Sequence, residues 1–194
     1  MTGGAVLLCG FEPFNGFPVN SSWEAVKDLD GKKIHGRRVF SRRLPVSYVR
    51  AGRTLGRALA EARPEIALAF GVHGGREVRL ERVAVNADHE KRPDNDGKRR
   101  WDRPILPGRP VAVTASLPLD RIEKRLNKRG LPAKVSFHAG TYLCNHVFFL
   151  LMQKGIQAGF IHVPPLWSPR RRQGWSLERL RSAVRLILDE VLSR

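Results

Sequence analysis

Apolar and polar positions follow two periods along this chain, and the change from one to the other predicts strands and helices in turn. Short continuous apolar runs, typical of strands buried on both faces, occur at residues 5–9 and in "EIALAFG" and "AGFIHVP". Between such runs, apolar residues recur every three or four positions, as Leu55, Leu59 and Ala62 do, which predicts amphipathic helices. Strands that alternate with helices favour a largely parallel sheet with helices on both faces.

The expected elements follow one another in a regular order. The expected strands cover residues 5–9, 39–46, 65–71, 80–86, 111–118, 133–137 and 158–164. The expected helices cover residues 20–29, 48–62, 119–126, 141–152 and 176–192. Residues 87–110 are polar and rich in Pro, Gly and charge, which predicts a long loop.

The chain is long enough for one domain with a sizeable core. We therefore expect an α/β protein, a single-domain α/β/α sandwich over residues 1–194 with a largely parallel, mixed central sheet. No apolar run approaches the roughly 20 residues that span a bilayer, so we expect no membrane partner. Two cysteines do not make a disulfide framework, and "MTGGAVLLCGFEPF" lacks the basic start of a signal peptide. These features predict a cytoplasmic protein.

The charge balance is strongly basic. Thirty-five Lys and Arg residues against 18 Asp and Glu residues give a net charge of +17. Such a balance raises nucleic-acid binding as a hypothesis. However, the basic residues are scattered over runs such as "GKKIHGRR", "GKRRWDR" and "SPRRRQG", without zinc-finger spacing, an RNP-like aromatic motif or a basic zipper. We favour a generally basic surface and expect no specific nucleic-acid partner.

One cysteine falls at the start of an expected helix. In "FHAGTYLCNHVFFLLM", residues 137–152, Thr141 is the expected N-cap and Cys144 falls in the first turn. Cys144 is either a small core side chain or a nucleophile whose thiolate the helix N-terminus stabilises. Lowering a thiol pKa from about 8.5 to about 6 takes about 3.4 kcal/mol, whereas a helix terminus contributes about 2 kcal/mol at best. A nucleophile here therefore needs a cationic histidine as well.

Several histidines are candidates for that partner. His146 follows Cys144 by two residues, and positions i and i+2 of a helix do not face each other, so we expect His146 to be packed or hydrogen-bonded elsewhere. His73, in the glycine-rich "GVHGGR", and His138, just before the helix, both stay open. His162 lies near the carboxyl end of a buried strand, where α/β proteins gather their sites, although a core histidine fits that position equally well.

Glu81 is a carboxylate inside the apolar strand "VRLERVAVN". A buried charge without a partner is costly, so Glu81 either orients a histidine or forms a salt bridge with Arg79 or Arg82. Other chemistries fit poorly, because the chain has no P-loop, dinucleotide fingerprint, HExxH or CxxC motif. The histidines near Cys144 lack a usual zinc spacing. We expect no metal and no cofactor.

Five motifs occur in a fixed order along the chain. They are "LLCGFEPFNGFPVNSSW", "LERVAVN", "RPDNDG", "SFHAGTYLCNHVF" and "GFIHVPPL", and they cover most of residues 5–166. Together they resemble the motifs of the pyrrolidone-carboxylate peptidases (pyroglutamyl peptidase type I), a family of cysteine peptidases. Any one motif is weak support, whereas five in order are highly specific. The C-terminal helix matches only in character.

Carried over position by position, the resemblance places the family's nucleophile at Cys144, its histidine at His162 and its glutamate at Glu81. It implies a cysteine exopeptidase (omega-peptidase) that removes N-terminal pyroglutamate from peptides through a thioester. The thiolate of Cys144 would attack the carbonyl that follows the lactam ring, His162 would protonate the leaving amine, and Glu81 would orient His162.

The resemblance also implies a pocket for the pyroglutamyl ring. This ring is a neutral, flat lactam, which aromatic side chains and backbone hydrogen bonds can select without a buried carboxylate. Phe11 and Phe14 would flank the ring, and Asn20 would help to form the loop. The alternative is that both phenylalanines are core residues with no role in binding the ring.

Three positions depart from the family pattern. Val72 stands where many members have a glutamine of the substrate pocket. Lys91, with Arg92 beside it, stands where the family usually has an arginine, and lysine lacks the planar fork of arginine. Asn15 replaces a usual glycine in "FEPFNG". We nonetheless place Val72, Lys91 and Arg92 in the substrate-binding site.

The resemblance further implies pyroglutamyl peptides as substrates and a homo-oligomer, either a dimer or a tetramer. Two alternatives stay open: a related thiol amidase whose pocket has drifted, and an inactive, basic homologue that binds nucleic acid. Turnover of a pyroglutamyl amide favours the enzyme, and a salt-sensitive, stoichiometric shift of DNA or RNA favours the binding protein.

Overall fold

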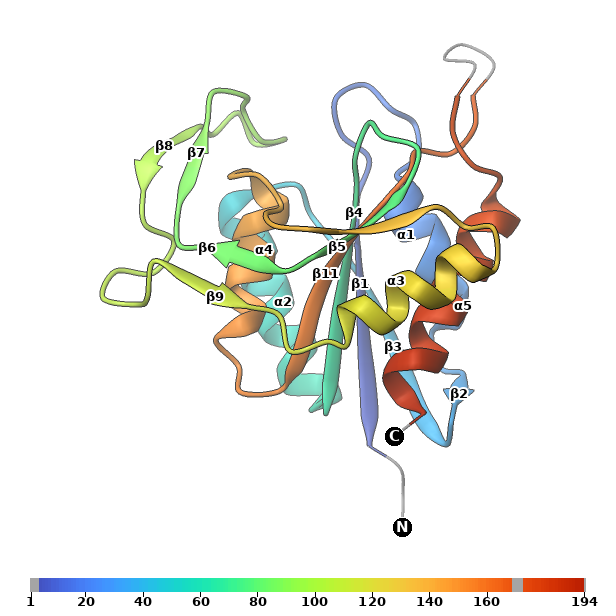
Figure 1. The fold of residues 1–194 in the computed structure, drawn as a ribbon. Coiled ribbons are helices and arrows are strands. Elements are labelled where there is room, and N and C mark those ends of the chain that lie inside the picture. The colour runs from blue at the N-terminus through green and yellow to red at the C-terminus, as the bar shows by residue number, and fades with distance from the viewer. Residues whose placement is uncertain (1–3, 169–172, 194) are drawn as a thin grey trace.

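A seven-stranded mixed sheet forms the centre of the residues that this computed structural model describes, which are 4–168 and 173–193 (Figure 1). The strand order is β10-β5-β11-β4-β1-β3-β2. The strands are β1 (Ala5–Phe11), β2 (Lys33–Ile34), β3 (Arg37–Leu44), β4 (Ile66–Val72), β5 (Val78–Glu81), β10 (Ala133–Ser136) and β11 (Gln157–Val163). Neighbours are parallel except at β5–β11 and β2–β3, which confirms the expected sheet. The single domain expected over residues 1–194 includes residues 1–3, 169–172 and 194, which lie outside the described ones.

Helices cover both faces of the sheet, so the expected α/β/α sandwich is confirmed (Figure 1). On one face lie α2 (Tyr48–Ala62) and α4 (Leu143–Met152). On the other lie α1 (Ser21–Val26) with its 3-10 continuation η1 (Lys27–Leu29), α3 (Leu119–Lys128) and α5 (Leu177–Leu192). Successive strand residues point to opposite faces. Leu7 therefore packs into the core under α2 and α4, and Val6 packs into the core under α1, α3 and α5.

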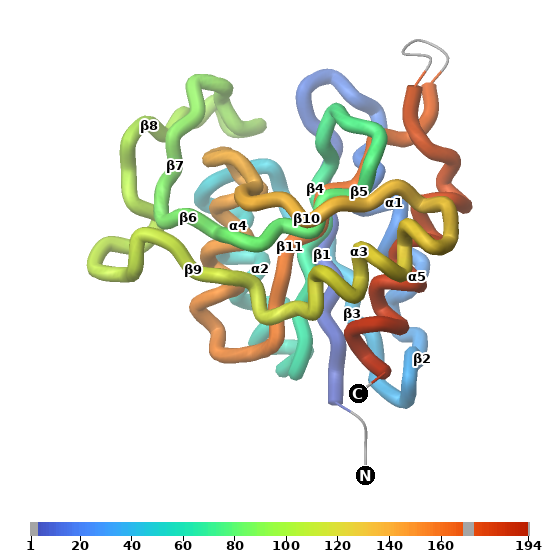
Figure 2. Tube along the Cα trace, in the orientation of Figure 1, coloured from blue at the N-terminus to red at the C-terminus, as the bar shows by residue number. Residues whose placement is uncertain are grey.

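Residues 82–115 leave the sheet and form an arm beside α4 (Figure 2). The arm pairs β6 (Val83–Val85) with β9 (Ala112–Thr114), and β7 (Asp88–Glu90) with β8 (Arg100–Arg103). Two expectations are corrected here. The strand expected at 80–86 divides into β5 and β6, because its halves pair with different neighbours. The loop expected at 87–110 contains the β7–β8 ladder.

Local chemistry explains where α2 begins and ends and why β1 extends past Gly10. α2 has the expected bounds, because the Ser47 side chain accepts a hydrogen bond from the Arg50 N–H and Arg63 closes the helix with φ +42° before Pro64. β1 continues past Gly10 to Phe11. A Cβ at Gly10 would lie 2.6 Å from the Trp23 Cα, so this glycine permits the close approach of α1 instead of ending the strand.

The start of α4 differs from expectation in one detail. Tyr142, and not Thr141, occupies the N-cap position, and its side chain makes no capping hydrogen bond. The Thr141 hydroxyl donates to the His89 carbonyl at 2.7 Å, and the His89 N–H donates to the Thr141 carbonyl at 3.1 Å. Thr141 therefore joins the helix start to the arm.

None of the helices within the described residues has the length and apolar character needed to cross a bilayer.

Candidate active site

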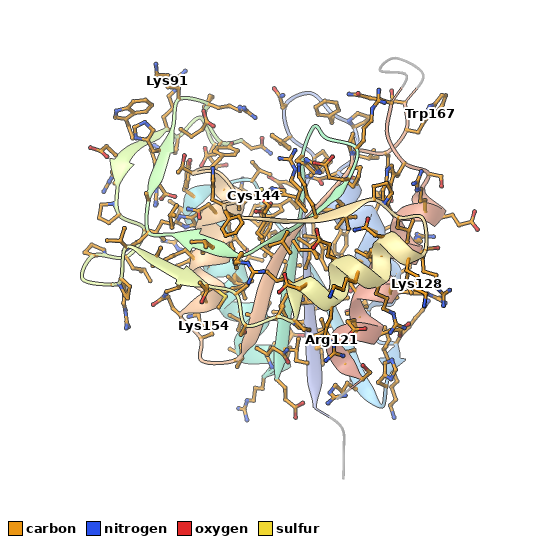
Figure 3. All side chains as sticks on the ribbon, viewed as in Figure 1. Lys91, Arg121, Lys128, Cys144, Lys154 and Trp167 are labelled. Atoms are coloured by element: carbon orange, nitrogen blue, oxygen red, sulfur yellow. The ribbon has the colours of Figure 1, made fainter. Side chains whose placement is uncertain are left out.

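Cys144 lies in the first turn of α4, at the edge of the sheet where the parallel strands β1, β4 and β11 end (Figure 3). Its side chain is partly exposed, whereas Cys9 is only 1% exposed within β1. Burial raises the pKa of the Cys9 thiol to about 12, and the opposing charge of Arg42 does not offset it. Cys9 therefore stays a neutral core side chain, and Cys144 is the cysteine that a substrate can reach.

Gly71, near the end of β4, makes room for the sulfur of Cys144. A Cβ added at Gly71 would lie 2.9 Å from that sulfur and 2.8 Å from Cζ of Phe160. Real Cβ atoms do not approach other heavy atoms so closely. The backbone of β4 thus forms one wall of the space around the sulfur.

His162 and Glu81 come together from neighbouring antiparallel strands. Glu81 in β5 lies opposite Phe160 in β11, two residues before His162, so both side chains point to the same face of the sheet. Nδ1 of His162 lies 2.7 Å from Oε1 of Glu81, and both residues are buried. The alternative salt bridges of Glu81 are absent in the described residues.

The two arginines beside Glu81 have other partners. Arg79 pairs with Glu77 at 2.9 Å, and Arg82 pairs with Asp120 at 2.8 Å. Glu81 is therefore free to act on the imidazole alone.

Two neighbours act on the protonation of His162. Burial disfavours the imidazolium, but the charge of the Cys144 sulfur, its hydrogen bond to the ring and the Glu81 carboxylate together raise the pKa of His162 to about 9. The imidazole is therefore a cation at neutral pH. This is the cationic histidine that a thiolate at a helix start requires.

His146 points away from Cys144, as its place in the helix predicts. Nδ1 of His146 lies 3.0 Å from both carboxylate oxygens of Asp88, which also pairs with Arg100 at 2.7 Å. His146 and Asp88 are buried. This chain of contacts joins α4 to the β7–β8 ladder of the arm.

His73 lies beside His162, with ring centroids 5.8 Å apart. Its Nδ1 accepts a hydrogen bond from the Gly75 N–H, so Nε2 carries the proton and donates to the Glu77 carbonyl at 2.7 Å. Burial lowers the pKa of His73 to about 4. His73 is therefore a neutral wall beside a cationic His162.

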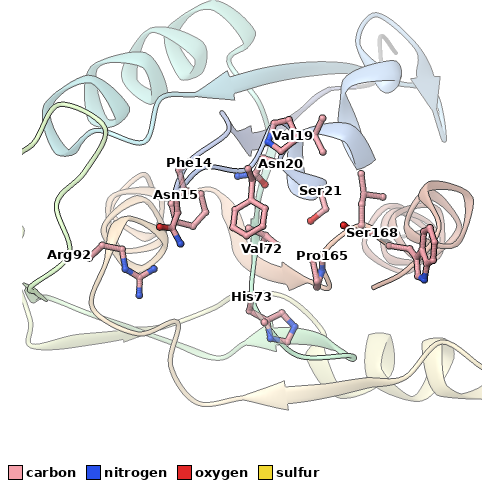
Figure 4. A pocket seen from close by; sticks show the side chains of 15 residues that line it. Phe14, Asn15, Val19, Asn20, Ser21, Val72, His73, Arg92, Pro165 and Ser168 are labelled. Atoms are coloured by element: carbon pink, nitrogen blue, oxygen red, sulfur yellow. The ribbon is translucent and has the colours of Figure 1, made fainter. Parts of the chain in front are cut away.

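Two cavities meet near Cys144. The inner cavity, of about 20 Å³, is lined by Phe11, Phe14, Asn20, Val46, Val72, Tyr142, Leu143 and Cys144. The outer cavity, of about 350 Å³, shares Phe14, Asn20 and Val72 with it (Figure 4). The outer cavity does not include Cys144. Of these two cavities, the inner one is therefore the one in which a bound group lies against the sulfur.

The loop that carries Phe14 is closed by Asn20. Nδ2 of Asn20 donates to the Glu12 carbonyl at 3.0 Å, and Oδ1 accepts hydrogen bonds from the N–H and hydroxyl of Ser22. In this loop Asn15 has φ +55°, a left-handed conformation that asparagine tolerates better than most residues. Asn15, which stands where the family usually has a glycine, can therefore keep the same loop shape.

Lys91 and Arg92 lie in different surroundings. Nζ of Lys91 lies 5.4 Å from the centre of the Trp101 ring, on the arm and away from Cys144 (Figure 3). Arg92 lines the outer cavity, and its guanidinium carbon lies 5.7 Å from the centre of the Tyr142 ring. The Tyr142 hydroxyl donates to the Pro93 carbonyl at 3.0 Å, which holds Arg92 beside the start of α4.

Sequence reasoning missed several residues that line the cavities. Val46, Tyr142 and Leu143 line the inner cavity, and residues 165–168 line the outer one. Tyr142 and Leu143 immediately precede Cys144, so their position at a helix start was a usable signal. Val46 reaches the site only through strand packing, which a sequence pattern does not reveal.

The described residues, 4–168 and 173–193, contain no group of three or more His, Cys, Asp or Glu side chains that could hold a metal ion. A partly exposed cysteine at a helix start, beside a buried and carboxylate-bound histidine, is typical of thiol hydrolases.

Comparison with known proteins gives the family. The model of the pyroglutamyl peptidase family matches residues 4–171. A pyrrolidone-carboxylate peptidase of Chromobacterium violaceum is 45% identical over 195 residues, covering 97% of this chain and 93% of that protein. One from Pyrococcus furiosus is 40% identical over 206 residues, covering 96% and 99%. The chain belongs to the pyroglutamyl peptidase family, a family of cysteine peptidases.

Solved structures agree with this assignment. The crystal structure of pyroglutamyl peptidase I from Bacillus amyloliquefaciens superposes with a TM-score of 0.91 at 34% identity and covers 99% of this chain and 98% of that one. Pyrrolidone carboxyl peptidase from Thermococcus litoralis also gives 0.91, at 36% identity and with 98% and 94% coverage. The fold is thus shared over almost the whole length.

Proposed function

We propose that this chain removes an N-terminal pyroglutamyl residue from peptides, with Cys144 as nucleophile, His162 as general acid and base, and Glu81 as the group that orients His162. The observation that carries the proposal is the buried contact of 2.7 Å between Nδ1 of His162 and Oε1 of Glu81, beside the partly exposed Cys144. Membership of the pyroglutamyl peptidase family supports the same chemistry.

In the first half of the reaction, the thiolate of Cys144 attacks the carbonyl carbon that joins pyroglutamate to the next residue, and a C–S bond forms. The imidazolium of His162 gives its Nε2 proton to the nitrogen of the leaving peptide, and the C–N bond breaks. The peptide leaves with a neutral amine. The pyroglutamyl group stays on Cys144 as a thioester.

In the second half, Nε2 of the neutral His162 accepts a proton from water, whose oxygen attacks the thioester carbon. The C–S bond breaks, pyroglutamate is released, and the thiolate–imidazolium pair is restored. Glu81 accepts the hydrogen bond from Nδ1–H throughout, which keeps Nε2 directed at the reacting atoms.

Negative charge develops on the carbonyl oxygen next to the start of α4. The first four N–H groups of a helix have no acceptor within the helix, and the helix dipole favours an anion there. The backbone N–H of Cys144 is our candidate donor to this oxygen. Lys91, which the resemblance places in the substrate-binding site, lies over Trp101 and takes no part in these bond changes.

The inner cavity is the proposed site of the lactam ring. It combines the rings of Phe11 and Phe14 with the apolar side chains of Val46 and Val72. Its small volume means that the ring enters only if a wall moves, and Phe14 is a partly exposed side chain on a loop. Val72 offers no amide, so we expect backbone groups to bind the lactam carbonyl and N–H.

Arg92 supports selection against ordinary peptides. It lines the outer cavity and lies beside Tyr142, which lines the inner one. A pyroglutamyl terminus carries no ammonium group, whereas an ordinary N-terminus does, and two like charges repel each other. Arg92 therefore favours a neutral N-terminus.

The test is hydrolysis of a pyroglutamyl reporter amide beside the prolyl reporter amide, which has the same ring size but a charged nitrogen and no lactam carbonyl. We expect turnover of the first and little of the second, and none of either by the Cys144→Ser variant. Equal turnover of both amides would favour a thiol amidase with a changed pocket. A folded wild-type protein that cleaves neither contradicts the proposal.

A further inference from the structure

The outer cavity is the largest feature near Cys144 that the proposed reaction does not yet use. It continues from the inner cavity across the shared residues Phe14, Asn20 and Val72. At about 350 Å³, it falls in the size range of ligand-binding pockets. In Figure 4, Arg92 and Ser168 lie on opposite sides of this cavity, with Val72 and His73 between them.

The outer cavity reaches the neighbourhood of His162 through His73. The leaving nitrogen must come within reach of His162, and His73, whose ring centroid lies 5.8 Å from that of His162, lines the outer cavity. The His73 N–H also donates to the carbonyl of Val163, the residue after His162, at 3.2 Å. The chain then continues into residues 165–168, which form the far wall of the cavity.

The walls of the outer cavity are mainly apolar. They include Phe17, Pro18, Val19, Leu166 and Trp167. Val19 is 47% exposed and Trp167 is 58% exposed, so two large apolar side chains stand open to solvent around one cavity. Both ring nitrogens of His73 are already engaged in hydrogen bonds, so His73 adds a neutral surface.

From this position and this lining we propose that the outer cavity binds the residues that follow pyroglutamate, and that it selects apolar or aromatic side chains there. The inference rests on the proposed function, because it takes His162 as the donor to the leaving peptide. An apolar side chain placed between Val19 and Trp167 leaves water together with those two side chains, which stabilises the complex. A small polar side chain removes less apolar surface from water there, and Arg92 is the charged side chain of this lining.

The experiment compares three substrates in about 0.5 M salt, where long-range attraction by the basic surface is screened. They are pyroglutamyl amide, which places no side chain in the outer cavity, pyroglutamyl-Phe-Leu-amide and pyroglutamyl-Asn-Ser-amide. We expect kcat/KM for the Phe-Leu peptide to exceed that for the Asn-Ser peptide by about tenfold or more.

Two exposed tryptophans provide a matched pair of variants. Trp167→Ala removes a wall of the outer cavity, and Trp101→Ala removes a side chain that is 50% exposed on β8, where it stacks on His89. We expect Trp167→Ala to lower the ratio of kcat/KM for the Phe-Leu peptide to that for the Asn-Ser peptide about tenfold, mainly through KM. Trp101→Ala leaves that ratio near its wild-type value. Val19→Ser is a second variant of the same wall, and thermal unfolding checks that each variant folds.

The outcomes separate the two proposals. If the wild-type protein cleaves none of the pyroglutamyl substrates, the proposed function fails. If it cleaves pyroglutamyl amide but has no preference for the Phe-Leu peptide, or if both tryptophan variants change the ratio equally, the cavity inference fails alone. A change of oligomeric state in Trp167→Ala, measured by sedimentation, without a change in the ratio would assign this wall to a subunit contact instead and overturn the inference.

Discussion

At the scale of single residues, the two cysteines have opposite surroundings. Cys9 is buried in β1 with a pKa raised to about 12, whereas Cys144 is partly exposed beside His162. We expect Cys144→Ser to lower kcat/KM for a pyroglutamyl amide by more than about 10³-fold, because a nucleophile is lost. Cys9→Ser should keep most of the turnover. Alkylation followed by mass spectrometry should find the label on Cys144, and equal losses in two folded variants would remove its special role.

The pKa of His162 sets the alkaline side of the pH profile. Because the pKa is raised to about 9, the imidazolium is present at neutral pH and is lost as the pH rises through about 9. We therefore expect kcat/KM to fall in that range, which is well above the ordinary histidine pKa of about 6.5. A profile that falls near pH 6.5 would contradict the pairing of a cationic His162 with Cys144 and Glu81.

Substitution of Glu81 tests how far its carboxylate raises the pKa of His162. Glu81→Gln keeps a hydrogen-bond acceptor for Nδ1 but removes the charge that helps to raise the pKa of His162. We expect the alkaline limb to move to lower pH and kcat/KM to fall by about 10- to 100-fold, since hydrogen bonds to charged groups contribute about 1.5–3 kcal/mol. The control is Glu77→Gln, which weakens the ion pairs of the partly buried Glu77 with Arg79 and Lys134 and should leave the alkaline limb in place.

At the scale of elements, β4 and α4 approach each other so closely at Gly71 that a side chain has no room. We expect Gly71→Ala to lower kcat/KM by about 10- to 100-fold, the equivalent of the 1–3 kcal/mol that overpacking costs. Gly56, an exposed position of α2 with open space around it, is the matched control. Gly56→Ala should raise the stability by about 0.4–1 kcal/mol and leave turnover unchanged. Thermal unfolding and initial rates measure both effects.

How much of the fold the sequence predicts depends on whether local or distant contacts decide an element. The bounds of α2 follow from Ser47 and Pro64, which are adjacent to it in the chain, so they could be predicted. The division of "LERVAVN" into β5 and β6 depends on partners at β11 and β9, which the local pattern does not contain. The β7–β8 ladder is likewise tied by Asp88 to Arg100 and His146.

The candidate site follows the same rule. Helix geometry is local, so it correctly separates His146 from Cys144. The choice among His73, His138 and His162 needs the pairing of β11 with β5, which no local pattern reveals. Family resemblance made that choice from the sequence. From the residues alone, it stayed open.

At the scale of the whole molecule, the net charge of +17 acts on substrates before they reach the site. A basic surface attracts acidic peptides over a distance that salt shortens, from about 10 Å at 0.1 M to about 3 Å at 1 M. We expect higher salt to lower kcat/KM several-fold for an acidic pyroglutamyl peptide and to change it little for a neutral pyroglutamyl amide. Initial rates across a salt series measure this. A strong, equal loss for both substrates would show that the charge acts on the site itself.

The pairing of β5 with β11 makes chemical competence depend on a very short strand. Glu81 is the last of the four residues of β5, and it is held beside His162 by the ladders to β10 and β11 and by the buried side chains of Val78 and Leu80. Opening of a buried core strand costs a free energy close to that of global unfolding, whereas loops and termini open at much lower cost. The pair of Glu81 and His162 is therefore as rigid as the core that holds β5. On warming, we expect turnover to persist until the core itself melts, so that activity and helical signal are lost over the same temperature range.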